Sequence, residues 1–199
     1  MNDSIKEDYP FNSWVASTIC NYLPVIIAAE AREHEDYSVA DIDMSAATLS
    51  YPGYKYYPLE VKRIMGSTQV YNFKEDGEWR NFFTSEYYGW LQFEDTGITT
   101  GAPIWIINAA DICGNEENAK LYKLKRDNAC LAFVAGDGIV LFSPKSLRKA
   151  IIGYAKRYCN HTELYNKKGK KALERKAVID LSKGLFIPCT PPKHLLIKN

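Results

Sequence analysis

The order of apolar and polar residues along the chain predicts a helix near its start. Residues 14–23 form this segment, and Asn12 or Ser13 can cap it, because both residue types are favoured at the first position of a helix. Pro24 interrupts the segment, since proline lacks the N–H that a helix interior needs. It either kinks the helix or begins a second helical piece over residues 24–34.

Two strands are predicted to follow. Residues 37–49 are rich in β-branched residues and alternate between apolar and polar side chains, which is typical of a half-buried strand. Residues 54–65 form a second segment of this kind. The turn-like sequence Ser-Tyr-Pro-Gly at residues 50–53 lies between them, so we expect the two strands to form an antiparallel hairpin.

The middle of the chain has less regular patterns. Residues 79–95 fit a helix or a strand, because their aromatic density obscures any period. Residues 103–112 contain a short continuous apolar run, which is typical of a strand buried on both faces. Residues 128–143 alternate well, and Asp137-Gly138 within them predicts a tight hairpin turn.

Another helix is predicted after this hairpin. Ser143 can cap it, and Pro144 is tolerated at the first helical position. We expect the helix to run over residues 144–159, with an apolar side and a largely basic side. The order of helix, strands and helix predicts an α/β fold in which helices flank a mixed central β-sheet.

The composition is that of an ordinary globular protein. Of 199 residues, 46% are apolar and 25% are charged, which excludes a disordered or fibrous chain. We expect residues 1–199 to form a single domain with a basic C-terminal portion over 145–199. No apolar run approaches the roughly 20 residues of a transmembrane helix, so no membrane partner is expected. The five cysteines include no C-x-x-C pair, which favours a reducing, cytoplasmic location.

The net charge of +1 hides a division along the chain. Residues 145–199 hold 14 of the 25 Lys and Arg and three Asp and Glu, a net charge of +11, and the remaining residues carry −10. A basic portion of this size favours an anionic partner, most commonly nucleic acid, although a solvated Lys-rich helix has the same composition. The candidate nucleic-acid-binding residues are Lys167, Lys168, Lys170, Lys171, Arg148 and Lys149.

Acidic residues and a lysine come together on the predicted hairpin. Side chains alternate across a strand, so Asp41 and Asp43 share one face, and Glu60 and Lys62 share one face of the next strand. If the turn lies near residues 51–52, Asp43 lies opposite Glu60, and the Cβ atoms of such neighbours are about 4.5–5.5 Å apart. Two carboxylates and an ammonium group can hold a hard divalent cation and orient a water molecule.

An Asp followed by a turn and then Glu-x-Lys on the next strand resembles the PD-(D/E)xK nuclease superfamily, which includes restriction endonucleases and archaeal-type Holliday-junction resolvases. The resemblance covers residues 13–64 in order and, more loosely, the apolar strand after them. It implies a restriction-endonuclease-like core and a phosphodiesterase that uses Mg²⁺ or Mn²⁺ and acts on DNA. It further implies that Asp43 and Glu60 bind the metal, while Lys62 positions or deprotonates the attacking water.

The same resemblance assigns further residues. Many members carry a Glu on the helix before the Asp strand, so Glu30, or alternatively Glu33, is expected to be a further catalytic metal ligand. Asp41 is the alternate ligand to Asp43. Resolvases and many restriction enzymes act as dimers, so the resemblance is compatible with a homodimer. The chain departs from the motif at Ile42, which stands where the family motif has a proline.

Other interpretations fit the same residues. Glu60 and Lys62 also fit a solvent-facing ion pair, which would contribute little to stability. Asp41 and Asp43 also fit polar positions on an exposed face. At the level of function, the alternative is a catalytically inactive nuclease-fold protein that binds nucleic acid or a protein partner as a scaffold, because a fold alone does not establish an activity.

Overall fold

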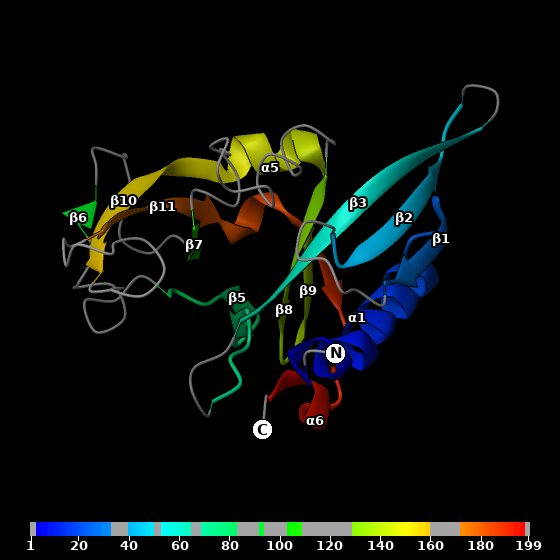
Figure 1. Ribbon diagram of the computed structural model, residues 1–199, viewed down its shortest axis with the longest axis horizontal. Helices are drawn as coiled ribbons and strands as arrows, with labels where there is room; N and C mark the ends of the chain where they lie inside the picture. The colour runs from blue at the N-terminus through cyan, green and yellow to red at the C-terminus, as the bar shows by residue number, and fades with distance from the viewer. Residues whose placement is uncertain are drawn as a thin grey trace.

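The computed structural model shows a mixed α/β fold (Figure 1). Its strands form a six-stranded sheet, called here the central sheet, a four-stranded sheet and a two-stranded ribbon. Within the described residues, no helix is long and apolar enough to cross a membrane. The residues that the structure describes are 3–32, 40–49, 53–64, 69–82, 92–93, 103–108, 129–159 and 172–197.

The N-terminal helix α1 spans Asp3–Tyr22, so the predicted helix is confirmed and begins earlier than expected. Phe11, Val15 and Ile19 recur at four-residue spacing, and all three side chains are buried. They belong to the same hydrophobic cluster as residues of the central sheet. This apolar stripe holds α1 against one face of that sheet, along the first three strands in Figure 1.

The segment after α1 is a strand, so the predicted second helix is wrong. Strand β1 spans Ile26–Ala31 and pairs antiparallel with β2, which spans Ile42–Ala47. The sequence Ala-Ala-Glu-Ala within β1 has good helix propensity. In the strand, the backbone groups on one side pair with β2, and the first and last residues of β1 are buried. Tertiary pairing therefore outweighs the local preference.

The predicted hairpin between the next two strands is confirmed. β2 pairs antiparallel with β3, which spans Tyr54–Arg63. β3 then pairs in parallel with β8, Cys130–Ala135. β9, Gly138–Phe142, and β12, Leu185–Pro188, complete the order β1-β2-β3-β8-β9-β12. The central sheet is therefore mixed, as the sequence predicts.

The hairpin of β8 and β9 is also present. Ala135 pairs with Gly138, so the two-residue turn is Gly136-Asp137, one position earlier than predicted. Every residue of both strands is buried. Both strands are apolar because hydrophobic clusters cover the two faces of the central sheet.

The helix predicted over residues 144–159 is correct only in its first half. Helix α5 spans Pro144–Ala150, and the Ser143 hydroxyl caps it by accepting a backbone hydrogen bond at 3.1 Å. The chain then continues as strand β10, Ile151–Cys159, which pairs with β11, Ala172–Asp180. The two isoleucines that open β10 are β-branched, and the pairing of β10 with β11 favours the strand, with a bulge at Ile152.

β10 and β11 belong to the four-stranded sheet, whose order is β6-β10-β11-β7. The strand predicted over residues 103–112 is confirmed as β7, Ile104–Asn108, and it lies in this sheet rather than in the central one. Most of residues 79–95 lies outside the described residues. The remaining elements are β6, Gln92–Phe93; the ribbon of β4, Lys74–Glu75, and β5, Glu78–Trp79; the 3-10 helix η1, Leu181–Lys183; and helix α6, Lys193–Leu196.

Successive side chains of β8 point to opposite faces of the central sheet and so belong to two different hydrophobic clusters. Cys130, Ala132 and Val134 belong to the cluster that contains α1. Leu131 and Phe133 belong to the other cluster, which includes residues of α5 and of the four-stranded sheet. The central sheet therefore has an α1 face and an opposite face, and the second of these carries the predicted acidic residues.

Candidate functional site on the β2–β3 hairpin

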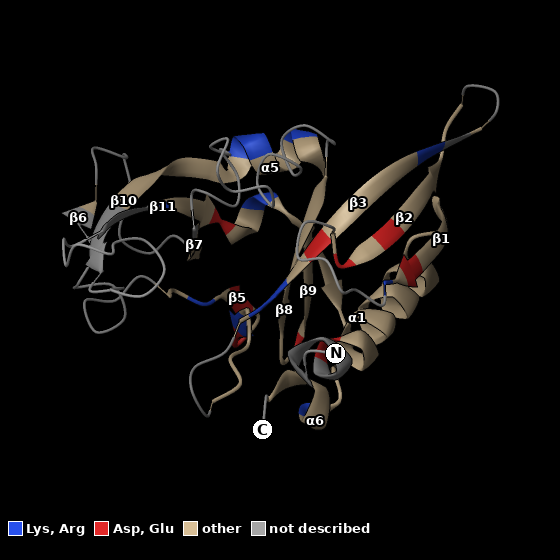
Figure 2. Ribbon diagram, viewed as in Figure 1, with Lys and Arg blue, Asp and Glu red and all other residues tan. Residues whose placement is uncertain are grey.

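The hairpin brings the predicted acidic residues onto one face of the central sheet. The register pairs Asp43 with Pro58, so the prediction that Asp43 lies opposite Glu60 is wrong by two positions. Because side chains repeat every two residues along a strand, Glu60 and Lys62 still share the face of Asp43. Figure 2 shows acidic positions in red on both β2 and β3.

Two neighbours hold the carboxylate of Asp43. Arg32, which follows β1, donates hydrogen bonds from its guanidinium to both oxygens of Asp43. The Tyr56 hydroxyl donates to the same carboxylate and accepts a hydrogen bond from Arg32 at 2.8 Å. The hydrogen bond to Asp43 raises the pKa of the Arg32 guanidinium, which therefore stays charged. The Arg32 and Asp43 side chains are each 32% exposed, so this ion pair is open to solvent.

Sequence analysis misses Arg32 at this site and does not predict the contact between Tyr56 and Asp43. Tyr56 has a usable signal, because it lies four positions before Glu60 and strand alternation places both on one face. Arg32 has no such signal. Its approach to Asp43 depends on β1 being a strand, whereas the local sequence predicts a helix there.

Glu60 and Lys62 form a partly buried ion pair. Lys62 Nζ lies 2.5 Å from Glu60 Oε1, and the Glu60 side chain is 5% exposed while that of Lys62 is 28% exposed. Their register partners on β8 are Leu131 and Phe133, both fully buried and apolar. A charge in such surroundings needs a partner, because desolvation of a lone carboxylate is costly. The alternative of a solvent-facing pair is therefore wrong for Glu60.

The two remaining predicted ligands lie at the margins of this site. Glu30 lies on β1 and not on a helix, so its predicted helical setting is wrong. It is exposed and is the register partner of Asp43. Asp41 precedes β2, and its carboxylate accepts a hydrogen bond from the Val61 backbone N–H at 2.7 Å. That bond ties the start of β2 to β3 and gives Asp41 a structural role.

Two of the predicted nucleic-acid-binding residues lie on α5, a helix that packs on the same face. Leu147 of α5 belongs to the cluster that contains Leu131 and Phe133, the register partners of the Glu60–Lys62 pair. Arg148 and Lys149 are exposed on this helix, which is marked in blue in Figure 2. The other four predicted nucleic-acid-binding residues lie outside the described residues: Lys167, Lys168, Lys170 and Lys171.

The donor chemistry of the hairpin is compatible with Mg²⁺. This ion is commonly bound through one or two carboxylates and completes its shell with water and phosphate oxygens, so Asp43 and Glu60 would be sufficient protein ligands. In the part of the chain that the structure describes, no group of three or more His, Cys, Asp or Glu side chains gathers as a metal site. Each of the two carboxylates is paired with a cationic side chain, and a metal ion would have to compete with these pairs.

Comparisons with models of protein families, with curated proteins and with solved structures find no match for this chain. Its function must therefore be argued from its own residues.

Proposed function

We propose that this protein is a Mg²⁺- or Mn²⁺-dependent endonuclease that hydrolyses DNA phosphodiester bonds, with Asp43, Glu60 and Lys62 at its active site. The observation that carries the proposal is the shared face of these three side chains on the β2–β3 hairpin. Two carboxylates beside a lysine are the groups needed to hold a divalent cation and to orient a water molecule.

Each residue has a defined role in this proposal. Asp43 and Glu60 would hold the metal, which when bound polarises the scissile phosphate and lowers the pKa of a water molecule. Lys62 Nζ lies beside the Glu60 carboxylate, where it can orient the attacking water by hydrogen bonding. Glu30, in register with Asp43, is a further candidate ligand at the exposed edge of the site.

Two features of the fold support this proposal. An antiparallel run of β1, β2 and β3 continues into β8 through a parallel ladder, which agrees with the mixed central sheet expected of a restriction-endonuclease-like core. Exposed Lys149 lies on α5, which packs over the same sheet face, where a DNA backbone would need cations.

A second candidate function rests on the contacts of Arg32. Its guanidinium bonds both oxygens of Asp43, which neutralises the carboxylate without a metal ion. A protein that keeps this arrangement would be a catalytically inactive nuclease-fold scaffold that binds nucleic acid or a protein partner. This candidate differs from the first in having no need for a divalent cation.

A cleavage assay separates the two candidates. The purified protein is incubated with duplex, branched and single-stranded DNA in Mg²⁺ or Mn²⁺, with EDTA as the metal-free arm. Metal-dependent cleavage is expected, and Asp43→Asn, Glu60→Gln and Lys62→Met should each lower the rate by at least about a hundredfold, because each removes a ligand or a water-orienting group.

Two controls make this assay decisive. Glu78→Gln changes an exposed carboxylate on β5 and should leave the cleavage rate unchanged. Near-isosteric Gln and Asn are used in place of Ala, because a cavity beside the buried Glu60 would confuse loss of fold with loss of chemistry. Wild-type protein that binds DNA but cuts none of the substrates would establish the scaffold instead.

The basic C-terminal portion has a test of its own. Replacement of Lys167, Lys168, Lys170 and Lys171 by Gln should weaken binding to all DNA sequences alike. It should also flatten the dependence of log affinity on log salt by roughly 0.9 for each phosphate that the variant no longer neutralises. An unchanged slope would show that this run of lysines is only a solvated surface.

A further inference from the structure

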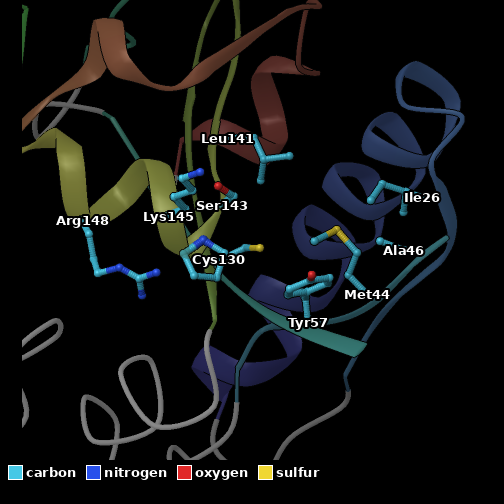
Figure 3. A pocket seen from close by; sticks show the side chains of 10 residues that line it. Ile26, Met44, Ala46, Tyr57, Cys130, Leu141, Ser143, Lys145 and Arg148 are labelled. Atoms are coloured by element: carbon cyan, nitrogen blue, oxygen red, sulfur yellow. The ribbon is translucent and has the colours of Figure 1, made fainter. Parts of the chain in front are cut away.

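A pocket of about 360 Å³ opens on the α1 face of the central sheet, opposite to the face that carries Asp43 and Glu60. Its floor is apolar and is formed by side chains of the strands (Figure 3). The floor includes Met44, Ala46, Tyr57, Cys130 and Leu141. Although α1 packs on the same face, no residue of its described part lines the pocket. Ligand pockets typically measure roughly 300–1,000 Å³, so this one suits a small molecule.

The mouth of the pocket is basic. Ser143, Lys145 and Arg148 line it from the start of α5, and no acidic residue is among the described lining residues. Lys145 and Arg148 are exposed. Neither forms an ion pair in the part of the chain that the structure describes. Figure 3 shows both side chains on the α5 side of the pocket, with the apolar floor beyond them.

The floor therefore suits an apolar part of a ligand, and the mouth suits an anionic group. Burial raises the pKa of the Cys130 thiol to about 12, so this group stays neutral and the floor offers no charge. A charged group placed on the floor would lose its hydration without compensation. At the mouth, a guanidinium and an ammonium group can bind a carboxylate or a phosphate while water still reaches them.

We propose that this pocket binds a small amphipathic anion, with an aliphatic chain against Met44, Tyr57 and Leu141 and a carboxylate or phosphate head on Lys145 and Arg148. The chain length is limited by the pocket volume, which favours medium-chain molecules. This inference does not depend on nuclease activity, because its floor lies on the other face of the sheet. It gives Arg148 a role distinct from contact with a DNA backbone.

Calorimetric titration with a matched set of probes tests the proposal. The probes share one ten-carbon chain and differ in the head group: decanoate, decyl phosphate, decanol and decyltrimethylammonium. We expect saturable one-to-one binding of at least one anionic probe, with decanol and the cationic probe at least about tenfold weaker. The tighter of the two anions identifies the head group as carboxylate or phosphate. Equal binding of decanol, or no saturable binding of either anion, would overturn the proposal.

Variants locate the binding to this pocket. The double variant K145Q/R148Q should weaken the anionic probe by at least about tenfold, because charge-assisted hydrogen bonds are removed. K193Q removes an exposed lysine of α6 and should leave binding unchanged. Ala46→Phe fills the pocket and should abolish binding. Since Ala46→Phe could fail to fold, the K145Q/R148Q result alone decides whether the anionic probe binds in this pocket. Unchanged affinity of a folded double variant for that probe would place the ligand elsewhere and overturn the proposal.

Discussion

The carboxylate of Asp137 accepts a hydrogen bond from the Phe73 backbone N–H at 2.7 Å, across 64 positions of sequence. Its other oxygen accepts from the Lys74 backbone N–H at 2.9 Å. Asp137 occupies the β8–β9 turn, and Phe73 is fully buried in the cluster on the opposite face from α1. One side chain therefore fastens the turn of the central sheet to the segment that leads into the β4–β5 ribbon.

We expect Asp137→Ala to lower the free energy of unfolding by about 2–4 kcal/mol, because two charge-assisted hydrogen bonds are removed and two backbone donors are left without their partner. Asp137→Asn keeps one acceptor and should cost about half as much. Urea denaturation measures both, and Glu75→Ala, an exposed change in the ribbon, serves as the control. An Asp137→Ala loss no larger than that of the control would contradict this role.

Glu60 and Lys62 should contribute jointly, and not additively, to the free energy of unfolding. Lys62→Met leaves the buried carboxylate of Glu60 without this cation and should cost about 2–3 kcal/mol, below the range for fully buried pairs because Lys62 is partly exposed. The double variant Glu60→Gln/Lys62→Met should cost less than the sum of the single variants, as a double-mutant cycle would show. Lys55→Met, on the exposed part of β3, is the matched lysine control. Strict additivity would argue against coupling.

Alkaline pH should destabilise the protein through two thiols. Burial raises the pKa of Cys130 to about 12, and burial together with the Asp137 charge raises that of Cys189 to about 11, from an ordinary value of 9.0. Above pH 9 the unfolded state therefore binds fewer protons than the folded state. The free energy of unfolding should fall as pH rises, by up to about 1.4 kcal/mol per pH unit for the buried Cys130 and by less for the partly exposed Cys189, until each thiol ionises in the folded state.

Urea denaturation at about pH 8.5 and about pH 10.5 measures this loss, and Cys130→Ala isolates one thiol from the other groups that titrate there. The variant should lose less stability than the wild type between the two pH values. Cys20→Ala, at a half-buried position on α1, controls for removal of any thiol. Equal losses in Cys130→Ala and wild type would show that Cys130 does not contribute.

Gly138 should not tolerate a side chain. A Cβ there would lie 2.6 Å from the carbonyl oxygen of Ile187 and 2.6 Å from Cε2 of Phe186, both on β12. Gly138→Ala should lower the free energy of unfolding by about 2–3 kcal/mol through overpacking. Gly77→Ala meets nothing within 4 Å but has a φ of +85°, so it should cost only about 1 kcal/mol. Thermal or urea denaturation that ranks these variants in the reverse order would contradict the packing argument.

The β2–β3 hairpin could be predicted because its two strands alternate and a turn sequence separates them. Its register could not, since sliding one strand by two residues keeps every side chain on its face. The sequence therefore predicts that Asp43, Glu60 and Lys62 share a face but cannot tell that Pro58 is the partner of Asp43.

Local sequence predicted the wrong secondary structure where the spacing of apolar residues fits both a helix and a strand. Residues 26–31 and 151–159 carry helix-compatible spacing, yet both are strands because another strand is present to pair with them. The contact of Arg32 with Asp43 follows from the first of these pairings. Such contacts depend on the partner strand, which no local window of sequence contains.

Leu59 and Cys130 are neighbours in the parallel ladder of β3 and β8, although 71 positions separate them along the chain. Closing so long a loop costs chain entropy before any contact offsets it, so pairings of this kind form slowly. The meander of β1, β2 and β3 joins segments that are close in sequence and can assemble early during folding. Glu60 and Lys62 lie on β3 next to β8, and we expect this pairing to form late. Their carboxylate and ammonium groups would then stay hydrated until β8 pairs with β3. We therefore expect this docking step, and not formation of the hairpin, to set the rate at which newly made chains acquire the candidate site.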